Sequence, residues 1–173
     1  MTSLKMVEYT SDRQIAWLSE LADEIWHECF PDIISDMQID YMVEKFQSFE
    51  AIKRQIAEEG YHYFAAELDG IPIGYYAVCK QPGSGINNVP TLFLSKLYLR
   101  KEWRGKGIAS IMYREIKRYA RKNGCELIKL TCNKRNTHAI SVYKHIGMVV
   151  IDETVTDIGG GFVMDDYVFG RMI

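Results

Sequence analysis

The feature that most constrains the fold is a strand, a short turn, a helix and a second strand in direct succession. Residues 91–100 (TLFLSKLYLR) place apolar side chains on both faces in their first half, which is typical of a strand inside a sheet. Residues 106–122 repeat apolar side chains at helical spacing and precede Gly124, a residue type that commonly ends helices. Residues 127–132 are again mainly apolar. A helix between two such strands predicts that the strands are parallel neighbours in one sheet.

The remaining segments add further strands and helices to this unit. Strands are expected over residues 4–9, 61–68, 71–79, 148–156 and 162–169, with turns at Asp69-Gly70 and at 157–161. Helical periodicity covers 12–29 and 38–58, and a short helix is expected over 137–145. Residues 81–90 (QPGSGINNVP) have the composition of a loop. Because no repeat or linker interrupts the chain, we predict one domain, residues 1–173, with a mixed α/β (α+β) sheet.

Charge is unevenly distributed along the chain. The net charge of −2 gives no general argument for a nucleic-acid partner, and none is expected. Residues 96–145 nevertheless carry fourteen Lys and Arg against three acids, whereas residues 1–60 carry thirteen acids against five bases. This asymmetry favours an anionic ligand at the basic segment and a cationic ligand at the acidic one. Solvated helix faces are the alternative explanation for both.

The four cysteines form no CxxC pair, and their spacing fits no zinc-binding pattern, so we expect reduced thiols and no metal site. Cys132 is interpreted as a small buried residue rather than an acyl carrier. His138 and His145 are expected at the surface. The first residues lack the apolar core of a signal peptide, and no apolar run is long enough to cross a membrane. We therefore expect a cytoplasmic protein that does not associate with membranes.

A turn follows residue 100 and contains the sequence Arg104-Gly-Lys-Gly107, and its two glycines are expected at the first positions of the following helix. The first N–H groups of a helix lack partners within it, and glycine allows an anion to approach the backbone, so this is a candidate phosphate site. Arg104 adds a fixed positive charge and is expected to bind a phosphate through two N–H groups. A tight turn that only serves packing remains the alternative. The pattern is neither a Walker loop nor a dinucleotide fingerprint, because both require glycines at other positions.

A second group of residues lies on the short helix. Asn136, Ala139 and Tyr143 are spaced by three and four residues and therefore share one helix face. They supply an amide, a small side chain and a phenol. A capping asparagine, a packing alanine and an amphipathic tyrosine would explain the same pattern without a ligand.

Taken together, the two motifs resemble those of the GCN5-related N-acetyltransferases (GNAT family). Arg104-Gly-Lys-Gly107-Ile-Ala109 matches the family's coenzyme A motif, and Asn136, Ala139, Tyr143 and Gly147 match its second motif. The resemblance covers residues 60–173 well and the N-terminal helices more loosely, where the chain is loosely similar to spermine/spermidine acetyltransferases. It implies a mostly antiparallel mixed sheet with flanking helices, acetyl-CoA as co-substrate, and an amine as acceptor. Members of the family often form dimers, so the resemblance allows a homodimer.

The resemblance also implies roles for individual residues. The backbone of Leu97, Tyr98 and Leu99 would pair with the pantetheine arm, and a strand N–H at Tyr98 or Leu99 could stabilise the oxyanion. Asn136 would bond the pantetheine, and Tyr143 would protonate the leaving thiolate. The backbone amides that would hold the pyrophosphate are those of Arg104, Gly105, Lys106, Gly107, Ile108, Ala109 and Ser110.

The general base and the acceptor are less constrained. Family members that acetylate polyamines carry a glutamate on the strand where this chain has Ser95 and Lys96, and neither residue is an evident base at neutral pH. Water, Glu28 or Asp165 are alternatives. A small cationic amine is expected as acceptor, since the N-terminal helices and the C-terminal hairpin carry the acids Glu24, Glu28, Asp32, Asp36, Asp165 and Asp166. A protein or peptide acetyltransferase, or a coenzyme A sensor without turnover, remains the alternative.

Overall fold

The computed structural model describes residues 3–83 and 88–173. Residues 84–87 of the expected 81–90 loop lie outside the described part. The elements, in chain order, are β1 (Leu4–Glu8), α1 (Asp12–Cys29), α2 (Asp36–Gln47), α3 (Phe49–Glu58), β2 (Tyr61–Leu68), β3 (Ile71–Gln81), β4 (Thr91–Leu99), the 3₁₀ turn η1 (Lys101–Trp103), α4 (Ile108–Lys122), β5 (Leu127–Asn133), α5 (Thr137–His145), β6 (Val149–Gly159) and β7 (Phe162–Met172).

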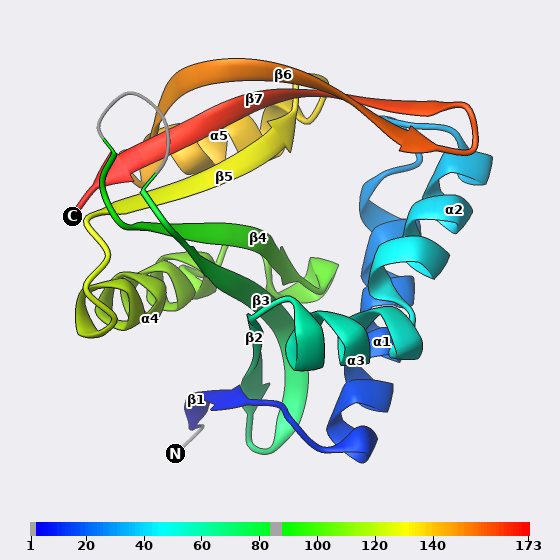
Figure 1. Cartoon of the computed structure of the whole chain (residues 1–173). Helices are drawn as coiled ribbons and strands as arrows, with labels where there is room; N and C mark the ends of the chain where they lie inside the picture. Colours follow the sequence, from blue (N-terminus) through cyan, green and yellow to red (C-terminus); the bar gives the residue numbers. More distant parts are fainter. Residues whose placement is uncertain (1–2, 84–87) are drawn as a thin grey trace. The chain divides into compact units, whose positions relative to one another are not determined.

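The strands hydrogen-bond in one sheet with the order β1-β2-β3-β4-β5-β7-β6 (Figure 1). The β1–β2, β2–β3, β5–β7 and β6–β7 pairs are antiparallel. β4 and β5 are parallel and pair over Thr91–Phe93 and Leu127–Lys129, as expected for the two strands that flank α4. The predicted mixed, mostly antiparallel sheet with flanking helices is confirmed.

Contacts divide the chain into two compact units, one of residues up to Cys79 with Lys96–Ile116, the other of Lys80–Ser95 with Lys117–Ile173. β3, β4 and α4 each continue from one unit into the other. A single domain over residues 1–173 therefore stays a prediction.

The core of the first unit forms between α1 and the β2–β3 hairpin. The α1 side chains Ile15, Leu18 and Ile25 pack with Tyr63 and Tyr75 of the hairpin, and all five are buried. Ser11 begins α1 with a capping box in which its hydroxyl accepts from Gln14 N and Gln14 Oε1 accepts from Ser11 N. In Figure 1, α1 and α3 lie beside β2 within this unit.

The expected single helix over 38–58 is wrong, because the segment forms two helices that meet at Ser48. This residue has extended backbone angles (φ −68°, ψ 159°), and its hydroxyl accepts a hydrogen bond from Ala51 N at 3.2 Å. A serine hydroxyl competes with the helix for backbone N–H groups, so Ser48 ends α2 and begins α3.

The second unit contains β5, α5 and the long β6–β7 hairpin. The hairpin strands are longer than expected and reach Gly159 and Met172. The turn is correspondingly shorter than the expected 157–161, and Asp157 Oδ1 accepts from Gly159 N at 2.8 Å beside it. Gly160 and Gly161 have positive φ, a backbone region that glycine adopts readily.

Within residues 3–83 and 88–173, no helix is long and apolar enough to span a bilayer. The same residues contain no group of three or more His, Cys, Asp or Glu side chains arranged to hold a metal ion.

Candidate functional site

The turn after β4 has the geometry expected of an anion site. Arg104 closes the 3₁₀ turn η1, with its N–H donating to Lys101 O at 3.1 Å. Gly105 and Gly107 have φ of +72° and +77°, and α4 begins at Ile108, two residues later than the sequence predicts. Other residue types are strained at such angles, so both positions require glycine for the backbone conformation.

Both glycines also face open space. A Cβ atom placed on Gly105 or Gly107 would meet no atom within 4 Å. The first helical hydrogen bond of α4 runs from Ile111 N to Gly107 O. The N–H groups of Ile108, Ala109 and Ser110 therefore have no carbonyl acceptor within the helix. Exposed glycines beside a helix N-terminus form a surface to which an anion can bind closely.

Arg104 does not extend into this open space. Its guanidinium donates to Leu99 O through Nε at 3.0 Å and through Nη2 at 2.9 Å, and Nη2 also lies 2.7 Å from Cys29 Sγ. Glu28 lies 3.7 Å away as an ion-pair partner. The side chain therefore fastens the turn to the end of β4, while Lys101 and Lys106 are the exposed cations of the turn. The Lys106 ammonium lies 4.8 Å from the centre of the Trp103 ring.

The end of β4 carries the residues expected to hold pantetheine. Leu97 and Tyr98 are half-buried and Leu99 is buried, and all three lie beyond Phe93, the last residue of β4 that pairs with β5. β3 approaches this stretch very closely, since a Cβ on Gly74 would lie 2.5 Å from Tyr98 O. The backbone of β3 thus packs directly against Leu97–Leu99.

The Tyr98 ring belongs to an aromatic cluster within the first unit. Its centre lies 5.6 Å from the rings of Trp26 and Tyr75 and 6.1 Å from that of Phe30. These contacts fix the end of α1 against β4.

Lys96 is buried, with 6% of its surface exposed. Its ammonium donates to Gln55 Oε1 at 3.1 Å and lies 5.1 Å from the centre of the Tyr63 ring. Gln55 also accepts from the Tyr63 hydroxyl at 2.6 Å, so one glutamine of α3 serves two buried donors of the sheet. Burial lowers the Lys96 pKa to about 7. The sequence does not reveal this environment, because the partners lie on other elements.

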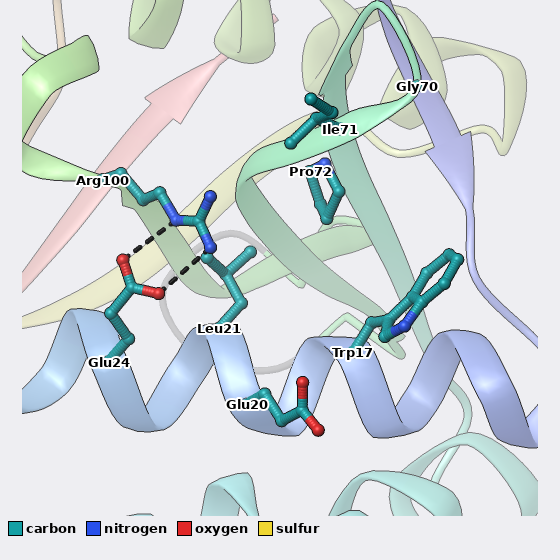
Figure 2. A pocket seen from close by; sticks show the side chains of 8 residues that line it. All are labelled: Trp17, Glu20, Leu21, Glu24, Gly70, Ile71, Pro72 and Arg100. Carbon is teal, nitrogen blue, oxygen red and sulfur yellow. Dashed lines mark hydrogen bonds and ion pairs between the residues drawn. The ribbon is translucent and has the colours of Figure 1, made fainter.

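The acids expected to attract a cation have different surroundings. Glu24 forms an ion pair with Arg100, with Nε–Oε1 and Nη2–Oε2 distances of 3.0 Å, and Figure 2 shows this pair at the wall of a pocket between α1 and the β2–β3 hairpin. Trp17, Ile71 and Pro72 give this pocket an apolar side, and no sequence motif indicated it. Asp32 and Asp36 are exposed.

In the second unit, Asn136 begins α5. Its Oδ1 accepts from Ala139 N at 3.1 Å, which confirms the capping interpretation and leaves the side-chain NH₂ as a donor that the cap does not use. Tyr143 follows two turns later, half-buried, with its ring centre 5.7 Å from that of Phe169. Burial, with a smaller contribution from Cys132, raises the Tyr143 pKa well above its usual range. The phenol is therefore a proton donor at neutral pH rather than a base.

Cys132 is 7% exposed, as the sequence predicts, and burial raises its pKa to about 12. Such a thiol is a poor nucleophile at neutral pH. Asp165 is exposed and lies 2.9 Å from Lys134, which also binds Glu153 at 2.7 Å. His138 and His145 are exposed, as predicted.

Comparison with known proteins gives the family. The sequence model of the acetyltransferase (GNAT) family matches residues 18–148, more than half of the chain. The chain belongs to the GNAT acetyltransferase family. The predicted family and enzyme class are thereby confirmed.

Three proteins that are similar to this GNAT acetyltransferase have low sequence identity to it. An uncharacterized N-acetyltransferase of Methanocaldococcus jannaschii is 28% identical over 85 residues, which is 49% of this chain and only 38% of that relative's length. The PaiA N-acetyltransferase of Thermoplasma acidophilum, solved with coenzyme A, is 22% identical with a TM-score of 0.75 and 99% of both chains covered. A GNAT acetyltransferase of Elizabethkingia anophelis with acetyl-CoA bound is 11% identical with a TM-score of 0.63 and 98% of both chains covered. These two structures share the fold.

Proposed function

We propose that this GNAT acetyltransferase transfers the acetyl group of acetyl-CoA to the primary amine of a small cationic acceptor. The observation that carries the proposal is the turn after β4, where Gly105 and Gly107 have left-handed angles and face open space beside the N-terminus of α4. A pyrophosphate there would accept from the amides of residues 105–110 and would be neutralised further by Lys101 and Lys106.

The pantetheine arm would continue from this turn along β4. Leu97–Leu99 lies between the turn and the last β5-paired residue, so an extended arm would add to the sheet there. Related structures with coenzyme A and acetyl-CoA bound support the choice of ligand. In the second unit, the Asn136 amide would donate to the arm.

Tyr143 is proposed to protonate the departing thiolate. Its raised pKa keeps the phenol protonated at neutral pH, which suits a general acid. The nitrogen lone pair of a neutral amine would attack the thioester carbonyl, forming the C–N bond as the C–S bond breaks. A strand N–H at Tyr98 or Leu99 would stabilise the oxyanion.

The acidic residues support a cationic acceptor, with thirteen acids in residues 1–60. A polyamine fits this charge. A protein or peptide acceptor, or coenzyme A sensing without turnover, is the competing assignment, and the experiment below separates them.

The test is acetyl transfer followed by mass spectrometry. Purified protein and acetyl-CoA are incubated with polyamines, amino acids, aminoglycosides and peptides. An acetylated polyamine supports the proposal, an acetylated peptide favours the protein acetyltransferase, and acetyl-CoA binding without any product favours the sensor. With the amine found, Tyr143→Phe should lower kcat by about 100-fold or more, while Tyr167→Phe, a second half-buried tyrosine of the same unit, should change it little.

A further inference from the structure

One carboxylate oxygen of the buried Asp166 has no hydrogen-bond donor within the part of the chain that the structure describes. Its residue surface is 6% exposed, and Oδ1 has no hydrogen-bond donor among residues 3–83 and 88–173. The neighbouring Asp165 is exposed and paired with Lys134 at 2.9 Å. Buried carboxylates are ordinarily paired, because removing an ionised oxygen from water without a donor is costly. The orphaned oxygen of Asp166 therefore indicates a donor that binds there.

Its place in the sheet relates Asp166 to the second motif. Asp166 of β7 is paired in register with Asn133, the last residue of β5. Lys134 N donates to Asp165 O at 3.1 Å directly after β5, and Asn136 begins α5 two residues later. Because side chains alternate along β7, Asp166 lies on the face of the sheet opposite to Asp165 and Tyr167. The carboxylate is thus at the end of β5 from which α5 starts.

The burial and charges around Asp166 favour its role as a proton acceptor. Burial, and then the negative charge of Asp165, raise its pKa to about 6, against the opposing effect of Lys134. The Asp166 charge also raises the pKa of the Cys132 thiol, and Cys132 in turn raises that of the Tyr143 phenol. Cys132 pairs in register with Tyr167, and the Tyr143 ring packs on Phe169, so Tyr143 lies on the face of the sheet opposite to Asp166. Asp166 is ionised near neutral pH with an appreciable proton affinity and Tyr143 keeps its proton, so the two faces carry a proton acceptor and a proton donor, the combination that acid–base catalysis uses.

We propose that Asp166 binds the ammonium group of the acceptor and accepts a proton from it, which makes the amine nucleophilic. This inference rests on the proposed function. The proton passes from nitrogen to the Asp166 carboxylate, the freed lone pair forms the C–N bond, and the C–S bond breaks. Tyr143 gives its proton to the thiolate and recovers one from the new amide nitrogen, and Asp166 releases its proton to solvent.

The experiment compares Asp166→Asn with Asp165→Asn, which removes the same charge one residue away on the opposite face. The substrate is the amine that the wild type acetylates fastest in the panel above. Asp166→Asn should lower kcat/KM for this amine by about 100-fold or more and remove the limb of its pH profile near 6. Asp165→Asn should stay within about threefold of wild type above this limb and should move the limb to lower pH, because the Asp165 charge raises the Asp166 pKa. Acetyl-CoA affinity should be unchanged in both, and Asp166→Glu should recover part of the activity.

Thermal unfolding identifies a variant that fails to fold, and the near-isosteric Asp166→Asn is expected to fold. Equal activity of the two Asn variants, or an equal loss of acetyl-CoA affinity in Asp166→Asn, overturns the inference alone. A wild-type protein that binds acetyl-CoA but acetylates no amine overturns the proposed function, and this inference with it.

Discussion

The guanidinium of Arg104 folds back onto the carbonyl oxygen of Leu99, to which Nε and Nη2 donate at 3.0 and 2.9 Å. One side chain thus joins the end of the strand proposed for pantetheine to the turn proposed for pyrophosphate. Its contribution to a bound anion is therefore to hold the turn in shape rather than to contact the anion.

Arg104→Lys should weaken acetyl-CoA binding by about tenfold, because lysine keeps the charge but lacks the two N–H groups that donate to Leu99 O. Isothermal calorimetry gives the affinity. The control is Lys106→Gln, which removes a charge from the same turn without touching Leu99. A smaller loss of affinity in Arg104→Lys than in Lys106→Gln would show that charge, not shape, dominates.

Gly107→Ala should lose acetyl-CoA affinity and also about 1–2 kcal/mol of unfolding free energy, because alanine is strained at φ +77°. Gly124→Ala provides a matched control. Gly124 has φ +69° and open space within 4 Å, but it follows the C-terminus of α4. It should lose similar stability and bind acetyl-CoA normally. Similar affinity losses in both variants would mean that strain alone explains the effect.

Gly74→Ala should destabilise the protein by about 2 kcal/mol or more, because the new Cβ would lie 2.5 Å from the backbone oxygen of Tyr98. At Gly170 the nearest atom is the Cδ1 of Ile151 at 2.7 Å, the movable end of a side chain. Gly170→Ala should therefore cost less. Urea unfolding of both variants measures the difference, and the reverse order would contradict the close approach of β3 and β4.

Lys96 should make stability rise with pH. Its pKa is about 7 when folded and 10.5 when unfolded, so between these values the unfolded chain binds more protons. The unfolding free energy should therefore be highest above pH 10.5 and should fall as the pH is lowered to 7, because the protonated amine is costly to bury. Lys96→Met should remove this rise of the unfolding free energy with pH, which is at most about 1.4 kcal/mol per pH unit. Lys5→Met, at an exposed lysine, should leave it unchanged. Urea unfolding between pH 7 and 9.5 gives the comparison.

Sequence reasoning is most successful where one segment determines its own structure. The residues of α1 and α5 follow directly from periodicity and capping, and the glycine turn follows from its residue types. The division at Ser48 was missed because the apolar period continues across it, while a single hydroxyl decides the backbone.

Partnerships between distant segments could not be predicted. Lys96 and Gln55 are 41 residues apart, and only folding brings the amine under α3. The same holds for the carboxylates. Glu28 and Asp165, which the sequence offers as bases, are both in ion pairs, whereas Oδ1 of the buried Asp166 has no donor among the residues that the structure describes.

The contact between Cys29 and Arg104 provides a chemical reporter. The half-buried Cys29 thiol lies against the guanidinium that fastens the glycine turn, at 2.7 Å from Nη2. Because the guanidinium lies against the sulfur, we expect a thiol reagent to attach to Cys29 faster when Arg104 moves aside. A ligand that stabilises the turn should therefore slow alkylation at Cys29, which mass spectrometry follows without an enzymatic assay.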